Sequence, residues 1–273
     1  MTTWDRGVAA IESNLTLGET SKRHWFPWIS RVPVVIMGGP GAGKTAIWSK
    51  LTGRPAANAM STKVDKGYFF GRRGLRRTLT VTTIPGQDSE QRYLDIDRYF
   101  GIYTAVHGVI FVASFGFDQI WPDESEVTAA ELDPFTIEEL STRNIRRELK
   151  SFQETCNRIR HKHAVAADPF FKPKWLLVLV NKVDLYWDAI DQARDYYAPG
   201  CNSEFDREAT ELQRSIGTLA GFAYRVIPMA LSPMPYVFSS NRGDLPIDSQ
   251  LEPSHGKASL KLLADTLEEL NGS

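Results

Sequence analysis

The sequence predicts an α/β protein whose mostly parallel β-sheet is covered by helices on both faces. Strand-length apolar runs alternate along the chain with segments that repeat apolar residues at helical spacing. The chain is 273 residues long and 42% hydrophobic, which is enough to bury a large core. We expect residues 1–31 to form an N-terminal extension and residues 32–273 a single domain. The expected strands are 32–37, 67–73, 75–83, 106–114, 175–180 and 222–230.

The first expected strand runs directly into a phosphate-binding motif. Residues 38–45 read GGPGAGKT and match G-x-x-x-x-G-K-[ST] at every fixed position. In such a loop the glycines let backbone N–H groups turn toward the α- and β-phosphates. The lysine reaches the β- and γ-phosphates, and the Ser or Thr hydroxyl binds Mg²⁺. A helix from Ala46 to Leu51 follows, and its N-terminus favours an anion. The predicted nucleotide-binding residues are Gly38, Gly39, Pro40, Gly41, Ala42, Gly43, Lys44 and Thr45, with Thr45 also a metal ligand.

A second motif, Asn181-Lys182-Val183-Asp184, follows the apolar run 175–180. This N-K-x-D motif resembles the guanine reader of Ras-like GTPases. The carboxylate of Asp184 can accept from N1–H and from the exocyclic amine of guanine, whereas adenine offers no such pair. Lys182 is expected along the base plane, and Asn181 is expected to tie this loop to the phosphate loop. Together the two motifs predict GTP or GDP as the ligand and disfavour an ATPase of another branch.

The resemblance to Ras-like small GTPases covers about residues 32–115 and 175–270. It implies a P-loop GTPase fold, with a six-stranded, mostly parallel sheet and the nucleotide at the carboxyl ends of the strands. It also implies a Mg²⁺-dependent molecular switch that hydrolyses GTP slowly unless an activating protein assists. Residues 118–174 lie outside the resemblance and are expected to form a long helical insertion.

The helical pattern of this insertion begins near Asp133, the expected N-cap, with Pro134 at the first helical position. One face of this helix carries Ile137, Leu140, Ile145, Leu149, Phe152, Cys156 and Ile159. A later helix is expected to start after Ser203 and to stop at Gly221. The last expected helix carries Leu260, Leu263, Leu267 and Leu270 on one face.

A third motif, T-x-P-G-Q, spans residues 83–87. It departs from the usual D-x-x-G-Q because Thr83 stands where a carboxylate normally holds a water on the metal. The form is similar to that of bacterial MglA-type GTPases, which bind and hydrolyse GTP despite this loss. The resemblance implies that the Gly86 N–H contacts the γ-phosphate and that Gln87 orients the attacking water, with Lys44 as the second catalytic residue.

Two departures from the family pattern motivate an alternative function. Pro40 stands beside the expected γ-phosphate, and proline has no N–H and a fixed φ. Thr83 offers a hydroxyl where a carboxylate normally holds a water on the metal, so the metal is held less firmly. The alternative is therefore a GTP-binding scaffold or adaptor subunit with little or no hydrolysis.

The remaining family elements are assigned by spacing. Thr62 lies about seventeen residues after Thr45, where the first switch segment should supply a second metal-ligating threonine, and Ser61 is a rival. Ala230, at the end of the last expected strand, could offer its N–H to the guanine carbonyl.

Charge and composition limit the choice of partner and compartment. The formal net charge of −1 argues against nucleic acid as a partner. Cys156 and Cys201 are far apart, and the sequence shows neither an apolar run of membrane-spanning length nor a signal peptide, so we expect a cytoplasmic protein. We expect an unidentified protein effector or activating protein. A basic turn between the second and third strands could be merely solvated, or it could contact an acidic partner, lipid headgroups or RNA. Its arginines are Arg72, Arg73, Arg76 and Arg77.

Overall fold

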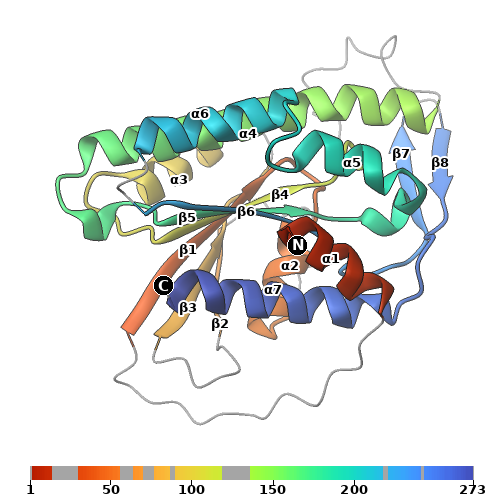
Figure 1. Ribbon diagram of the computed structural model, residues 1–273, viewed down its shortest axis with the longest axis horizontal. Helices are drawn as coiled ribbons and strands as arrows, with labels where there is room; N and C mark the ends of the chain where they lie inside the picture. The colour runs from red at the N-terminus through yellow and green to blue at the C-terminus, as the bar shows by residue number, and fades with distance from the viewer. Residues whose placement is uncertain are drawn as a thin grey trace.

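The protein folds around a six-stranded β-sheet with the strand order β2-β3-β1-β4-β5-β6 (Figure 1). Only β2 and β3 pair antiparallel, and the other neighbouring strands of this sheet are parallel. The strands are β1 (Ser30–Gly38), β2 (Asp65–Phe69), β3 (Arg77–Thr83), β4 (Gly108–Ala113), β5 (Trp175–Val180) and β6 (Ala223–Pro228). The computed structural model describes residues 2–13, 30–55, 64–69, 77–86, 90–118, 136–217, 221–240 and 243–272. The predicted fold class is confirmed.

The hydrophobic core lies on both faces of the sheet. Strands β4 and β5 are buried along their whole length, which explains their continuous apolar sequences. Successive residues of a strand point to opposite faces, so each strand contributes to two clusters. The first face includes Val109, Phe111, Leu176 and Val178. The second includes Ile110, Val112, Leu177 and Leu179.

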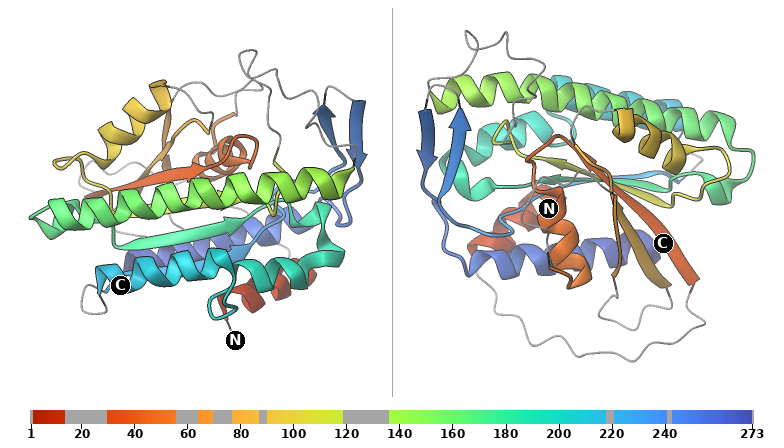
Figure 2. Two further views of the ribbon diagram at one scale, coloured as in Figure 1. Left: turned by 90° about the horizontal axis from the view of Figure 1, so that it is seen from above. Right: turned by 180° about the vertical axis from the view of Figure 1, so that it is seen from behind.

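Helices cover both faces, as Figures 1 and 2 show. The first face is covered by α3 (Glu90–Phe100), α4 (Ile137–Val165), α5 (Ile190–Tyr197) and α6 (Glu204–Ile216). The second is covered by α2 (Lys44–Thr52) and α7 (His255–Gly272). Helix α1 (Thr3–Glu12) packs against β6 and α7. Short 3₁₀ helices span Pro169–Phe171, Val183–Leu185 and Trp187–Ala189.

The long insertion helix is confirmed, but its predicted start is wrong. Helix α4 has 29 residues and its N-cap is Thr136, not Asp133. The Thr136 hydroxyl accepts from the Glu139 N–H, and the Glu139 carboxylate accepts from the Thr136 N–H, both at 3.1 Å. This reciprocal capping box satisfies two backbone donors at once, which favours a helix start at Thr136 over the expected start with Pro134 at the first helical position.

The later helices are confirmed with one corrected boundary. The Ser203 hydroxyl caps α6 by accepting from the Asp206 N–H at 3.0 Å. The helix ends at Ile216 rather than continuing to Gly221, because Gly217 adopts a φ of 85° that leaves the helical region. In α7 the predicted core residues Leu263, Leu267 and Leu270 are buried, and Leu260 packs against the same cluster.

A small antiparallel hairpin was not predicted. Strands β7 (Tyr236–Ser240) and β8 (Gly243–Ile247) pair with each other, apart from the main sheet. In Figure 1 they stand beside α5 at one end of the molecule. The predicted basic turn lies mostly outside the described residues, and only the backbone of Arg77, at the start of β3, is described. Of the helices in the described ranges, none is both long and apolar enough to cross a membrane.

Candidate nucleotide site

The predicted site residues gather at one edge of the sheet. The loops after β1, β3, β4, β5 and β6 all follow the carboxyl ends of parallel strands. Gly38 pairs with Val112, and Val180 lies between Ala113 and Pro228 in register. The strand ends therefore lie level with one another, at the edge where ligands bind in open α/β sheets.

Glycines shape the phosphate loop. Gly38, Gly41 and Gly43 have φ values of 137°, 72° and 101°, in the left-handed region that other residues rarely adopt. At Gly38 a Cβ would also lie only 2.4 Å from the Val112 carbonyl oxygen. The loop leads directly into the N-terminus of α2, so free backbone N–H groups of this turn can bind an anion.

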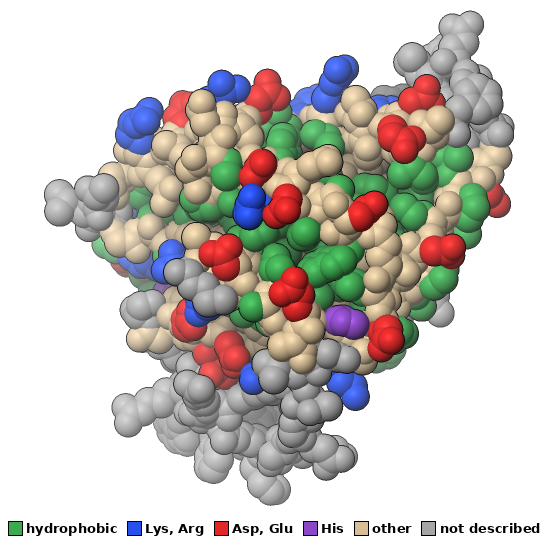
Figure 3. Space-filling model, turned by 45° about the vertical axis from the view of Figure 1, so that its right-hand side comes forward, with side chains coloured by type: hydrophobic (Ala, Val, Ile, Leu, Met, Phe, Trp, Pro, Cys, Tyr) green, Lys and Arg blue, Asp and Glu red, His purple; other side chains and the backbone are tan. Residues whose placement is uncertain are grey.

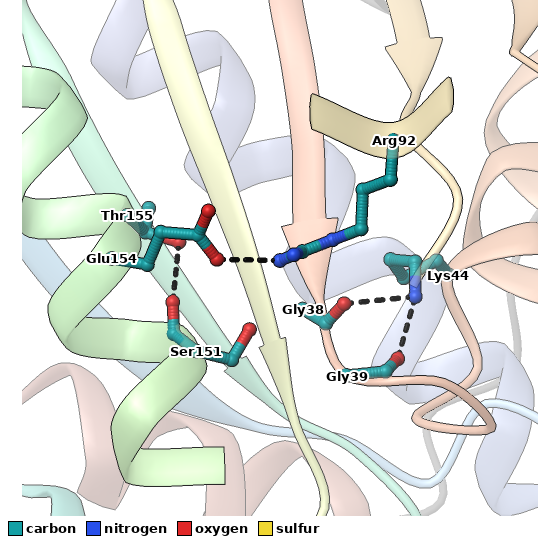
Figure 4. Close-up of polar contacts among 7 residues, drawn as sticks. All are labelled: Gly38, Gly39, Lys44, Arg92, Ser151, Glu154 and Thr155. Carbon is teal, nitrogen blue, oxygen red and sulfur yellow. Dashed lines mark hydrogen bonds and ion pairs between the residues drawn. The ribbon is translucent and has the colours of Figure 1, made fainter. Parts of the chain in front are cut away.

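Lys44 is buried beneath this loop. Its Nζ donates to the carbonyl oxygens of Gly38 and Gly39 at 2.9 and 2.5 Å (Figure 4). Burial lowers the pKa of Lys44 to about 7; the charge of Arg92 adds to this decrease and that of Asp118 opposes it. A bound phosphate would favour the charged form, because an anion close to an ammonium raises its pKa.

Arg92 of α3 lies near Lys44 and was missed by the sequence analysis. Its Nη2 lies 2.7 Å from Oε2 of Glu154 on α4, and the arginine is 6% exposed. Figure 4 shows the Arg92 side chain reaching from α3 toward Glu154, with Lys44 and the loop glycines nearby. Arg92 and Glu154 are 62 residues apart, so no local pattern in the sequence indicates that they pair.

The third motif packs directly against the phosphate loop. A Cβ on Gly86 would lie 2.3 Å from Lys44 Nζ and 2.6 Å from the nitrogen of Pro40. A glycine is therefore required here for steric reasons. Thr83, at the end of β3, is 1% exposed, and its hydroxyl has no hydrogen-bond partner among the described residues.

The hydroxyl groups at this edge fit a magnesium ion. Thr45 at the start of α2 offers an oxygen ligand, and hard cations prefer oxygen. The unpartnered buried hydroxyl of Thr83 can bond to a water on the metal. Ser61, Thr62 and Gln87 lie outside the described residues.

Asn181 joins the N-K-x-D motif to the loop 38–45, as predicted. Its side-chain Nδ2 donates to the carbonyl oxygen of Ala42 at 3.0 Å, and this hydrogen bond is buried. The Asn181 amide also explains why position 43 is a glycine, since a Cβ there would lie 2.3 Å from Asn181 Nδ2.

Lys182 is half-buried, and its ammonium group has partners within the protein. Its Nζ donates to the carbonyl oxygen of Phe117 at 2.6 Å and lies 4.3 Å from the centre of the Tyr236 ring, on β7. Burial lowers the pKa of Lys182 to about 8, and the charges of Asp118 and Asp184 oppose the decrease. An unpredicted hairpin residue thus covers the second residue of the motif.

The segment 231–251, which contains the hairpin, also covers Asp184. The Gln250 N–H donates to the Asp184 carbonyl oxygen at 2.7 Å. Burial raises the pKa of the Asp184 carboxyl, and hydrogen bonds from its own backbone, the Ser249 hydroxyl and the Met234 backbone oppose that rise. These contacts join Asp184 to Met234, Ser249 and Gln250, which are 50 or more positions later in the sequence, so residue patterns could not indicate them.

The Ala230 N–H, which is predicted to face the guanine carbonyl, has another partner in this structure. It donates to Oγ of Ser259 on α7 at 3.0 Å, in a buried position. The predicted contact with a guanine carbonyl would require this hydrogen bond to break. Residues 231–240 and 243–251, rather than Ala230, therefore lie over the N-K-x-D motif in this structure.

Comparisons with known proteins report distant likenesses. No protein-family model matches the chain, and no curated protein matches it in sequence. Among solved structures it is similar to the FeoB G-domain from Methanococcus jannaschii, at 15% identity over 90% of this chain and 100% of that one, with a TM-score of 0.43. It is also similar to the mammalian SRP receptor, at 15% identity over 88% of this chain and 99% of that one, with a TM-score of 0.44. The function is therefore inferred from the site itself, and the nearer resemblance to MglA-type GTPases stays a prediction.

Proposed function

We propose that this protein binds GTP and GDP with Mg²⁺ and hydrolyses GTP as a two-state switch. The buried hydrogen bond from Asn181 to Ala42 carries this proposal. A nucleotide spans the distance from base to phosphates, so its site needs the two loops at a fixed separation. Asn181 sets that separation by tying the guanine motif to the phosphate loop.

The chain offers complementary groups to both ends of the nucleotide. Backbone N–H groups of residues 41–45 and the Lys44 ammonium face the negative charge of the phosphates. The Asp184 carboxylate accepts from the two donors on the edge of guanine. Adenine lacks that pair, so it leaves a buried carboxylate without its partners.

Magnesium would be held by the hydroxyls of Thr45 and Thr62, with the Thr83 hydroxyl bonded to a metal-bound water. When bound, the ion neutralises charge on the β- and γ-phosphate oxygens. The absence of a carboxylate at Thr83 predicts a weaker hold on the metal than in relatives with aspartate there.

Hydrolysis and switching depend on the γ-phosphate. The Gly86 N–H contacts it and Gln87 orients the attacking water, in the roles that the family resemblance implies. When the γ-phosphate leaves, the segments around Thr62 and Gly86 lose their contacts and relax. Turnover is expected to be slow until an activating protein assists.

Competition among nucleotides tests the proposal. The wild type should bind GTP far more tightly than ATP, and Asp184→Asn should shift the preference toward XTP, because an amide can donate to the carbonyl that replaces the amine. Displacement of a fluorescent guanine nucleotide by GTP, ATP and XTP measures both effects. Asp195→Asn, an exposed aspartate on α5, is the control and should behave as wild type. Equal displacement by ATP and GTP in the wild type would contradict guanine recognition.

The alternative function is a GTP-binding scaffold with little hydrolysis, favoured by Pro40 in the loop and by the hydroxyl of Thr83. Gln87→Leu separates it from the switch. If Gln87 orients the water, the variant should retain GTP affinity while single-turnover hydrolysis falls tenfold or more, about 1.4 kcal/mol of barrier for each tenfold. A wild type that keeps GTP intact for hours with excess Mg²⁺ and added cell extract, unaffected by the substitution, would favour the scaffold.

A protein effector and a cytoplasmic location complete the proposed function. On the face drawn in Figure 3, Asp and Glu side chains lie among hydrophobic groups. The formal net charge of −1 disfavours a nucleic-acid partner.

A further inference from the structure

The turn that follows β4, residues 114–118, contacts both ends of the proposed nucleotide site. The Phe117 carbonyl oxygen accepts from Lys182 Nζ at 2.6 Å. On the other side, a Cβ on Gly39 would lie 3.2 Å from Oδ2 of Asp118, so this carboxylate lies against the phosphate loop. No sequence motif includes this turn.

Asp118 is a buried acid close to two motif lysines. It is 2% exposed, and its Oδ1 accepts from the Ser114 hydroxyl at 3.0 Å. Lys44 and Lys182 donate to backbone carbonyl oxygens and form no direct ion pair with Asp118 in the described structure. Burial raises the pKa of Asp118, while the charges of Lys182 and Lys44 oppose the rise. The carboxylate thus acts on both ammonium groups through space.

The insertion helix and α5 hold this turn in place. Asn144 Nδ2 of α4 donates to the carbonyl oxygens of Gly116 and Asp118, at 2.9 and 3.0 Å. The Glu148 carboxylate of α4 accepts from the Ser114 N–H at 2.7 Å. Tyr197 of α5 accepts from the Phe115 N–H at 3.0 Å. These hydrogen bonds hold the backbone of the turn, and the Ser114 hydroxyl holds the Asp118 carboxylate.

We propose that Asp118 lowers the affinity of the site for phosphate groups and so speeds nucleotide release. This inference rests on the proposed function. A nucleotide brings several negative charges to the loop, and a carboxylate held against that loop repels them in a region with little water to screen the charges. Asp118 attracts the two lysines both with and without a ligand, so this attraction favours neither state. The repulsion of the phosphates therefore decides the direction of the effect.

The test is Asp118→Asn, which removes the charge and keeps a side chain that can accept from Ser114. Dissociation constants for GTP, GDP and inorganic pyrophosphate, each with Mg²⁺, are measured at pH 6.5. This pH lies below the pKa values of Lys44 and Lys182, about 7 and about 8. The variant should bind all three ligands about tenfold more tightly or better, with slower release of a fluorescent GDP. Asp206→Asn, another buried aspartate, is the control and should stay within twofold of wild type.

The outcomes separate this inference from the proposed function. If the wild type binds GTP and the folded variant binds it equally or more weakly, Asp118 does not lower affinity although the guanine site stands. If the wild type shows no preference for GTP, the proposed function fails, yet tighter pyrophosphate binding by the variant still supports a repulsive carboxylate against the loop. Asp118→Ser removes the same charge and replaces the amide variant if that one does not fold.

Discussion

The proposed site has a phosphate half, residues 38–45 and 83–86, and a base half, residues 181–184 with the segments 114–118 and 231–251. The phosphate half consists mainly of one continuous loop whose shape is set by three glycines with positive φ. The base half is assembled from segments far apart in the sequence. Lys182 bonds to Phe117 and lies under Tyr236, while Asp184 bonds to Gln250.

This difference indicates how each half responds to change. A loop with locally determined geometry loses function when one of its own side chains is removed. A region built from distant segments depends on residues that never touch the ligand. The buried hydrogen bond between Asn181 and Ala42 connects the two halves, so a change in one half can affect the other.

The largest effect is expected from Lys44→Ala in the phosphate half. Loss of the ammonium leaves several phosphate charges unpaired, so GTP affinity should fall by about a hundredfold or more. Calorimetry with GTP and Mg²⁺ measures it. Lys50→Ala, on the exposed side of the same helix, is the control and should bind normally. Unchanged affinity in the Lys44 variant would show that this loop is not the nucleotide site.

A smaller effect is expected from Asn181→Ala, which removes the connection between the halves. It leaves the buried Ala42 carbonyl without its donor, which costs about 1–3 kcal/mol, so GTP affinity should fall by about tenfold. Pyrophosphate, which uses only the phosphate half, should lose less. The same titrations measure both ligands, with Asn157→Ala on the exposed face of α4 as the control. Equal losses for GTP and pyrophosphate would mean that the two halves are not separate units.

The smallest effect is expected from Glu148→Gln, behind the base half. Burial raises the pKa of Glu148 to about 8, and Asp118 adds to the rise. A raised carboxyl pKa stabilises the fold below about pH 4.5, and this contribution is lost as the pH rises through about 8. The glutamine amide does not titrate, so its stability does not fall in this way. The melting temperature of the variant, relative to that of the wild type, should therefore be higher at pH 8.5 than at pH 5. Melting curves at both pH values decide it, and a constant difference would contradict the raised pKa.

The sequence alone determined those parts whose information is local. The motif 38–45 specified the phosphate loop because its glycines are required by backbone geometry wherever the loop occurs. Apolar runs fixed β4 and β5, since strands buried on both faces need apolar side chains throughout. Asn181 was placed correctly because the motif itself implies the tie to the loop.

Only the tertiary structure decided what surrounds these motifs. Helix α4 was expected, yet its buried polar residues Asn144 and Glu148 were missed, because apolar periodicity does not show which turn a polar side chain will bond. The hairpin over Lys182 and the carboxylate of Asp118 against the loop depend on contacts between segments tens of residues apart. Such contacts form when the chain packs, so they leave no spacing in the sequence from which they could be predicted.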